Sequence, residues 1–243
     1  MAIFFFTYGD DKFSNTKKRI ENEAINSKFF NEVKIYGREN IDDFFLEKTK
    51  PYIDIRGGFW LWKALFLKQT IDRMSENDYC VYLDAGCTIN PNGGNRLKEY
   101  LELINNHESG VLSFRMDGLD EEQYTTEKVF SHFNIDINSS IRKSGQIMAT
   151  MIIFRKCDKS LKIINDFYNL SLDDTVLFSD EFNKVGNCER FIDNRYDQSI
   201  FSVLRKKYET VEIVDETWAP DNNGWNNLYY VKKIPFLATR IRS

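Results

Sequence analysis

The chain has 243 residues, of which 42% are hydrophobic and 29% are charged, and its formal net charge is -4 at pH 7. This length suits one large α/β domain or two small ones, and the lack of a basic excess argues against a nucleic-acid-binding protein. Two histidines cannot form a multi-histidine metal site, and the four cysteines have no metal-type spacing. We therefore expect reduced thiols in a cytosolic protein.

In chain order we expect a strand at 3–7, a helix at 15–26, a strand at 33–36, a helix at 60–74, a strand at 79–83, a helix at 96–105, a strand at 111–114, a helix at 125–133, a long strand at 146–154, helices at 160–169 and 199–208, and a short strand at 211–214. This alternation is typical of a mainly parallel sheet flanked by helices. The chain has only four prolines and neither repeats nor a low-complexity linker, which favours a single domain over residues 1–243.

No apolar run is long enough to cross a bilayer, and the apolar segment at 1–6 lacks the basic region and cleavage site of a signal peptide. We expect a cytoplasmic protein, either free or peripheral to the membrane. A basic group near the C-terminus fits an anionic lipid surface, a pyrophosphate or a solvated tail. Its members are Lys232, Lys233, Arg240 and Arg242.

The predicted strand at 79–83 ends abruptly on Asp84, Ala85 and Gly86. A buried strand of an α/β sheet delivers such a carboxylate to the carboxyl edge of the sheet, where these folds bind ligands. Asp84 is placed to meet a divalent cation and a phosphate, and the two small residues allow a ligand to approach the backbone closely. The alternative is an ordinary turn that begins with an aspartate.

Two further segments could bind a nucleotide. Tyr8 follows the first strand, where a base could stack on its ring while Thr7 reads the edge of the base; an ordinary strand exit is the alternative. Arg56 and two glycines precede the helix at 60–74, whose N-terminus favours anions. Lys63 lies in its first turn and could meet a pyrophosphate, and the aromatic residues around it could equally belong to the core.

Three segments could bind a sugar. Asp197 and Gln198 precede an amphipathic helix and together offer hydrogen-bond donors and acceptors for hydroxyl groups, although Asp197 could also cap that helix. Gln146 opens a strand that starts with small residues, as a pocket floor would. The polar segment at 215–227 carries Trp218 and Trp225, and we expect an ordered loop that lies over a site.

Taken in order, four motifs resemble a family of small glycosyltransferases of the GT-A fold, found in bacterial polysaccharide clusters and in large DNA viruses. The motifs are Gly-Phe-Trp-Leu-Trp-Lys (58–63), Tyr-Leu-Asp-Ala-Gly-Cys (82–87), Gln-Ile-Met-Ala (146–149) and Tyr-Asp-Gln-Ser-Ile-Phe-Ser (196–202). The resemblance implies that Tyr8 holds the base, Lys63 the phosphates, Asp84 the ribose or a metal, and Asp197 the sugar or the acceptor.

In that family a metal binds an Asp-X-Asp motif, but Gly86 stands here in place of the second acid. Asp84 could hold Mn²⁺ or Mg²⁺ with help from water and diphosphate oxygens. Alternatively, Lys63 and arginine side chains neutralise the diphosphate without a metal.

The sequence thus predicts an enzyme that moves a hexosyl or related group from a nucleoside-diphosphate-sugar, with UDP as the expected nucleotide, to a glycan or polysaccharide acceptor that is free or lipid-linked. If the transfer inverts the anomeric carbon, Asp197 is the first candidate for the base and Asp117 the second. The alternative function is a module that binds a nucleotide-sugar or glycan without chemistry. A phosphohydrolase is disfavoured by the shortage of histidines and of clustered carboxylates.

Overall fold

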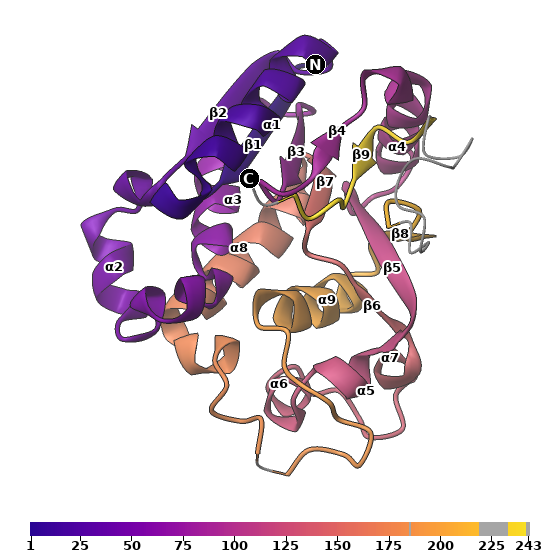
Figure 1. The fold of residues 1–243 in the computed structure, drawn as a ribbon. Helices are drawn as coiled ribbons and strands as arrows, with labels where there is room; N and C mark the ends of the chain where they lie inside the picture. Colours follow the sequence, from indigo (N-terminus) through magenta and orange to yellow (C-terminus); the bar gives the residue numbers. More distant parts are fainter. Residues whose placement is uncertain (185, 219–232, 242–243) are drawn as a thin grey trace.

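The computed structural model describes residues 1–184, 186–218 and 233–241, and Figure 1 shows their arrangement. A seven-stranded sheet has the order β2-β1-β3-β7-β5-β6, with β8 paired to β5. Its strands are β1 (Ile3–Tyr8), β2 (Glu32–Tyr36), β3 (Tyr79–Leu83), β5 (Val111–Asp120), β6 (Gly145–Ile147), β7 (Met151–Arg155) and β8 (Val211–Val214). A separate antiparallel pair joins β4 (Thr88–Ile89) to β9 (Phe236–Leu237).

The sheet is mixed but mostly parallel. Strands β2, β1, β3, β5 and β8 run in one direction, and β7 and β6 run in the other. The antiparallel β7 lies between β3 and β5. The carboxyl end of β3 is therefore next to the amino end of β7, where Leu83 pairs with Met151.

Helices cover both faces of the sheet because side chains along each strand alternate between the two faces. Phe5 and Val81 pack on one face against α1 and α4, whereas Phe6 and Tyr82 pack on the other against α3, α8 and α9. The helices are α1 (Ser14–Ser27), α2 (Asp43–Thr49), α3 (Trp62–Arg73), α4 (Gly94–Asn105), α5 (Glu121–Tyr124), α6 (Glu127–His132), α7 (Ser140–Lys143), α8 (Asp158–Asp173) and α9 (Asp197–Lys207). None of the helices in the described ranges is both long and apolar enough to cross a bilayer.

The prediction of a single long strand at 146–154 is wrong, because the structure has two separate strands there, β6 and β7. Between them, the backbone N–H of Met148 donates to the carbonyl of Phe114, and that of Ala149 donates to the side chain of Gln198. A side chain of α9 thus takes the place of a strand partner for the N–H of Ala149, and the carbonyl of Ala149 accepts from the Nζ of Lys63 at 3.0 Å.

The helix predicted at 125–133 is also shorter than expected. The structure has two short helices, α5 and α6, and the side chain of Thr126 between them caps α6 by accepting from the backbone N–H of Val129. Threonine favours such caps over helix interiors because its hydroxyl bonds the backbone locally.

Candidate active site

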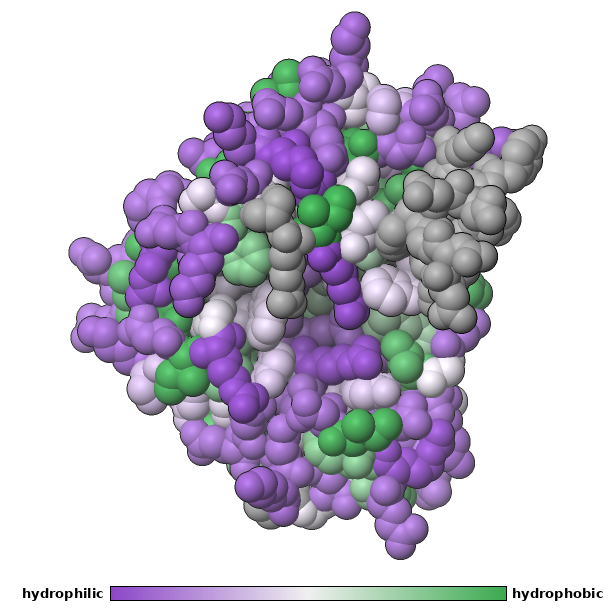
Figure 2. All heavy atoms as spheres, viewed as in Figure 1, coloured by the Kyte–Doolittle hydropathy of each residue, from purple (hydrophilic) through white to green (hydrophobic). Residues whose placement is uncertain are grey.

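A cleft of about 840 Å³ opens at the edge of the sheet where β1 and β3 end. Figure 2 shows it as a hollow in the middle of this face, with hydrophilic side chains inside it. Its walls come from the ends of β1 and β3, the turn before α3, the break between β6 and β7, the start of α9 and the segment after β9. The cleft thus lies at the carboxyl edge, where sequence reasoning places a site.

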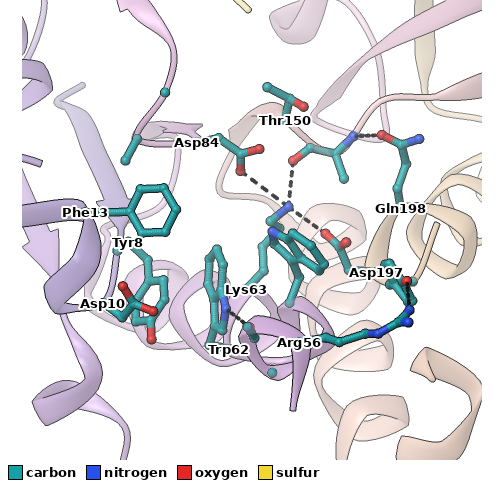
Figure 3. Close-up of a pocket in the computed structure, with 18 of the residues that line it drawn as sticks. Tyr8, Asp10, Phe13, Arg56, Trp62, Lys63, Asp84, Thr150, Asp197 and Gln198 are labelled. Atoms are coloured by element: carbon teal, nitrogen blue, oxygen red, sulfur yellow. Dashed lines mark hydrogen bonds and ion pairs between the residues drawn. The ribbon is translucent and has the colours of Figure 1, made fainter. Parts of the chain in front are cut away.

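Lys63 lies at the floor of this cleft, although only 2% of it is exposed (Figure 3). It belongs to the first turn of α3, as predicted. Its Nζ donates to Asp197 Oδ2 at 2.6 Å and to the carbonyl of Ala149 at 3.0 Å, and it lies 3.6 Å from Asp84 Oδ1. Because three acceptors of the protein surround this ammonium, a contact with a phosphate would have to displace one of them.

Asp84 comes directly after β3 and is the more accessible of the two carboxylates, with 34% of its side chain exposed against 6% for Asp197. The hydroxyl of Tyr82 donates to Asp84 Oδ1. The backbone N–H of Asp84 donates to the carbonyl of Thr150 at 2.8 Å, which fixes the turn against the start of β7. The Asp84 carboxylate is therefore oriented by its neighbours and still accessible to a ligand.

Arg19 of α1 stabilises the turn after Asp84 by hydrogen bonds to its backbone. One nitrogen of its guanidinium donates to the carbonyls of Ala85 and Cys87, both at 2.8 Å. Ala85 and Gly86 line the cleft, as expected of residues beside a ligand.

Asp197 is the first residue of α9, and its carboxylate is directed at Lys63. Tyr196 occupies the N-cap position, and no side chain caps the helix, so a role of Asp197 as N-cap residue is not observed. Gln198 lines the cleft beside it and bonds one backbone group and one side chain: its Oε1 accepts from the N–H of Ala149 at 3.1 Å, and its Nε2 donates to Gln146 Oε1 at 2.6 Å.

Burial and neighbouring charges shift the pKa of both members of the Lys63–Asp197 pair. Burial raises the pKa of Asp197 to about 6, against the opposing attraction of Lys63. Burial alone would lower the pKa of Lys63, but the two carboxylates outweigh it, and the pKa is raised. The pair is therefore ionised at neutral pH, and shifts of this kind are typical of functional sites.

The turn that precedes α3 has a left-handed backbone. Every residue from 56 to 60 has a positive φ, between 46° at Phe59 and 72° at Gly58. A Cβ on Gly58 would lie 2.9 Å from the carbonyl oxygen of Ile53, so only glycine fits there. Residues other than glycine adopt this conformation at a cost of about 1–3 kcal/mol each, and such residues cluster at functional sites. Arg56 thereby reaches the cleft and donates to the hydroxyl of Tyr196 at 3.0 Å.

Tyr8 also lines the cleft, but its ring already stacks on Trp62, with 4.1 Å between the ring centroids. Burial, reinforced by the charge of Asp10, raises its pKa to about 12. Asp10 and Phe13 line the cleft beside it and were not predicted. Their position just after the first strand was the signal that could have identified them.

Two predicted residues are buried behind the cleft instead of lining it. Thr7 is fully buried, and its hydroxyl has no hydrogen-bond partner in the described part of the chain. Gln146 is fully buried as well and donates to the hydroxyl of Thr125 at 3.2 Å. Neither residue belongs to the lining. Gln146 therefore supports the site through Gln198 and does not form the predicted pocket floor.

The predicted loop at 215–227 is described only as far as residue 218. Trp218 is 41% exposed, and the guanidinium of Arg240 lies 4.5 Å from the centre of one of its rings. Trp218 is not part of the lining, whereas Arg240 is. Trp225 and the rest of that loop lie outside the described residues.

The residues after β3 do not fit a resident divalent cation. Gly86 offers no ligand, and a Cβ there would lie 3.3 Å from the Cα of Arg240. One oxygen of Asp84 already accepts from Tyr82. Across residues 1–184, 186–218 and 233–241, no three His, Cys, Asp or Glu side chains cluster so as to hold a metal. The turn at 84–86 thus offers a Mn²⁺ or Mg²⁺ ion only the carboxylate of Asp84, and the nearby carboxylate of Asp197 is taken by Lys63.

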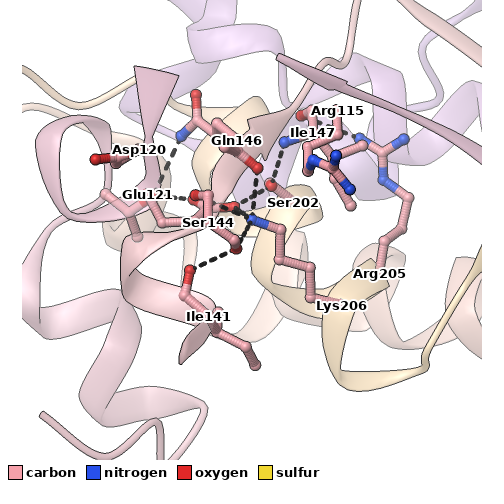
Figure 4. A network of polar contacts seen from close by, with 12 residues as sticks. Arg115, Asp120, Glu121, Ile141, Ser144, Gln146, Ile147, Ser202, Arg205 and Lys206 are labelled. Atoms are coloured by element: carbon pink, nitrogen blue, oxygen red, sulfur yellow. Dashed lines mark hydrogen bonds and ion pairs between the residues drawn. The ribbon is translucent and has the colours of Figure 1, made fainter. Parts of the chain in front are cut away.

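A buried polar network fixes α9, and with it Asp197, to the sheet (Figure 4). Glu121 of α5 is fully buried, and the Nζ of Lys206 on α9 lies 2.9 Å from its carboxylate. Lys206 also donates to the carbonyl of Gly145 at 2.7 Å, and the hydroxyl of Ser202 donates to Glu121. Both charges have partners inside the protein, so α9 cannot shift without breaking the network.

Comparison with solved structures identifies the fold, although no protein-family model and no curated protein matches this sequence. The chain is similar to a glycosyltransferase involved in the glycosylation of the major capsid of PBCV-1, with a TM-score of 0.53 and 10% identity over 98% of this chain and 92% of that one. The fold is of the GT-A type. The bifunctional glycosyltransferase WbbM is similar too, with a TM-score of 0.55 and 11% identity over 97% of this chain and 45% of that one. The predicted fold class is confirmed, and identities this low show the fold alone.

Replacing one member of the Glu121–Lys206 pair should strongly destabilise the protein. Glu121→Gln or Lys206→Met leaves a buried charge without its partner, which should lower the free energy of unfolding by about 3–5 kcal/mol. The double variant removes both charges and should lose less than the sum of the single losses. Urea denaturation of the three variants measures this coupling. Strictly additive losses would contradict a buried ion pair.

The stability of the protein should depend on pH through Asp197. Its folded-state pKa of about 6 lies above the ordinary value of about 3.9, so between these values the folded protein binds a proton more readily than the unfolded chain. The contribution of Asp197 to the free energy of unfolding is therefore lost as the pH rises from about 4 to about 6. Asp197→Asn has no such proton, so the stability of wild type minus that of the variant should fall across this window, by about 1.4 kcal/mol per unit of pKa difference. Urea denaturation at several pH values measures the difference, and parallel curves would contradict the shift.

Proposed function

We propose that this protein is a glycosyltransferase that moves a hexosyl or related sugar from a nucleoside-diphosphate-sugar to a hydroxyl of a glycan or polysaccharide acceptor, free or lipid-linked. The observation that carries the proposal is the cluster of Asp84, Lys63 and Asp197 at the carboxyl edge of the sheet. The cleft above it, at about 840 Å³, has the size of a site for a small ligand such as a nucleotide-sugar. The similarity of fold to two glycosyltransferases supports the same function.

The proposed reaction exchanges one bond of the sugar for another. The bond between the anomeric carbon and the diphosphate oxygen breaks, and its electron pair stays on the departing nucleoside diphosphate. The acceptor oxygen bonds to the anomeric carbon and gives up its proton, to a carboxylate if the configuration inverts and to the departing phosphate if it is retained. Negative charge develops on the diphosphate, so positive charge near it stabilises the transition state.

The two carboxylates have different roles in this proposal. Asp84 is accessible and contacts the donor at its ribose or sugar. Asp197 has a pKa near 6, which suits a base at neutral pH, and Lys63 holds it in place. Asp117 does not line the cleft and instead pairs with Arg115 at 2.7 Å, so it is no longer a candidate for the base.

Mixing the protein with candidate donors tests the function directly. We expect one sugar nucleotide among UDP-, GDP-, dTDP- and CMP-sugars to raise the melting temperature, with a UDP-sugar as the first candidate, because a ligand that binds only the folded state stabilises it. With acceptor glycans present, the same donor should release its nucleotide. Donor binding without any release would instead indicate a binding module.

Asp84→Asn should abolish turnover and leave the melting temperature nearly unchanged, because the carboxylate is at the surface of the cleft and the amide keeps its shape. Asp117→Asn is the matched control: it also removes one partly exposed aspartate, but away from the cleft, and should keep wild-type activity. Rates of nucleotide release from the two variants give the comparison. Turnover of Asp84→Asn close to that of Asp117→Asn would exclude the proposed role.

A further inference from the structure

Among the described residues, three of the six lysine and arginine side chains that line the cleft are already neutralised by carboxylates of the protein. Lys63 pairs with Asp197, Arg38 with Asp54, and Arg56 with Asp180. A departing diphosphate carries several negative charges and needs cations that no carboxylate already occupies.

Arg195 and Arg240 are different, because each rests on an aromatic ring. The guanidinium of Arg195 lies 3.7 Å from the ring centre of Tyr124, and that of Arg240 lies 4.5 Å from a ring centre of Trp218. Neither forms an ion pair with a carboxylate of the described residues, and both line the cleft. Lys12 also lines the cleft and forms no ion pair with a carboxylate in this part of the chain, but no aromatic ring or backbone bond to the turn at 84–86 holds its side chain there.

Two hydrogen bonds from its chain neighbours hold Arg240 beside the turn at 84–86. The hydroxyl of Thr239 and the backbone N–H of Ile241 both donate to the carbonyl of Gly86 at 2.9 Å. The backbone of Arg240 comes within 3.3 Å of the place that a Cβ on Gly86 would take. The segment with Arg240 thus fills the space in which the second acid of an Asp-X-Asp motif would stand.

Arg195 approaches the same region from the start of α9. Burial lowers its pKa, and the positive charge of Arg240 lowers it further, which places the two guanidinium groups within electrostatic range of each other. The carboxylate of Asp193, also in the lining, acts on Arg195 electrostatically but forms no ion pair with either guanidinium, so a multivalent anion between the two like charges would stabilise both. Guanidinium groups suit phosphate oxygens because they can donate two parallel hydrogen bonds.

We infer that Arg195 and Arg240 bind the diphosphate of the donor in place of a divalent cation on Asp84, so that binding and transfer do not need a metal. The inference rests on the proposed function and adds the source of the positive charge. When the bond to the anomeric carbon breaks, its electron pair stays on the diphosphate oxygen, and the two guanidinium groups compensate the charge that develops there.

Calorimetry with inorganic pyrophosphate and with UDP, both in excess EDTA, tests this inference without relying on turnover. Arg195→Gln and Arg240→Gln should each weaken binding about ten- to hundred-fold, as expected for a hydrogen bond to a charged group. Arg240→Lys keeps the charge and should lose less. The control is Arg73→Gln, which removes an arginine that pairs with Glu32 outside the cleft lining and should bind like wild type.

Binding in EDTA that both glutamine variants weaken, and that Mn²⁺ or Mg²⁺ does not strengthen, would support the inference. Binding that appears only with Mn²⁺ or Mg²⁺, or that neither variant changes, would overturn it and leave the glycosyltransferase proposal intact. If neither probe nor any sugar nucleotide binds with or without metal, both the inference and the proposed function are wrong.

Discussion

An ammonium group that is almost entirely removed from water must keep its acceptors, because an unpaired buried charge is very costly. Lys63 takes its acceptors from three separate segments: the turn after β3, the break before β7 and the start of α9. These segments are far apart in the sequence and meet at the floor of the cleft (Figure 3). The requirement of one charge therefore sets the relative position of the backbone pieces that line the site.

The helix that carries Lys63 is itself positioned by aromatic contacts. Trp62 stacks on Tyr8 of β1, and Phe66, one turn further along α3, stacks on Tyr36 of β2 with 4.2 Å between ring centroids. The left-handed turn at 56–60 lets the chain arrive at α3 in this orientation. Aromatic residues that could be assigned to the core or to a ligand thus belong mainly to the core, and they hold the ammonium in place.

Local patterns in the sequence were sufficient to predict most of the sheet and the position of the site. Strands such as 79–83 are continuous apolar runs that end on a polar residue, and they mark the carboxyl edge without knowledge of their partners. Of the predicted residues, Tyr8, Lys63, Asp84 and Asp197 all line one cleft.

What the sequence could not show depends on contacts between distant residues. At the break inside 146–154, Gln198 accepts from the backbone N–H of Ala149, and nothing within that run of apolar residues indicates such a contact. Gln146 has the same polar character as a ligand-binding glutamine, yet tertiary packing buries it. The place of Arg240 follows from the pairing of β4 with β9, two strands of only two residues each, which are too short to leave a periodic signal.

The direction of β7 determines which oxygen atoms meet at the edge of the sheet where β3 ends. In a fully parallel sheet, the strand next to β3 would begin at the opposite edge, about 16 Å away for a strand of five residues. Because β7 runs backwards, its beginning meets the end of β3, and Leu83 pairs with Met151. One edge of the sheet can therefore combine the carboxylate of Asp84, which follows one strand, with the carbonyl of Ala149, which precedes the next. A single reversed strand gives Lys63 two kinds of oxygen ligand from neighbouring positions.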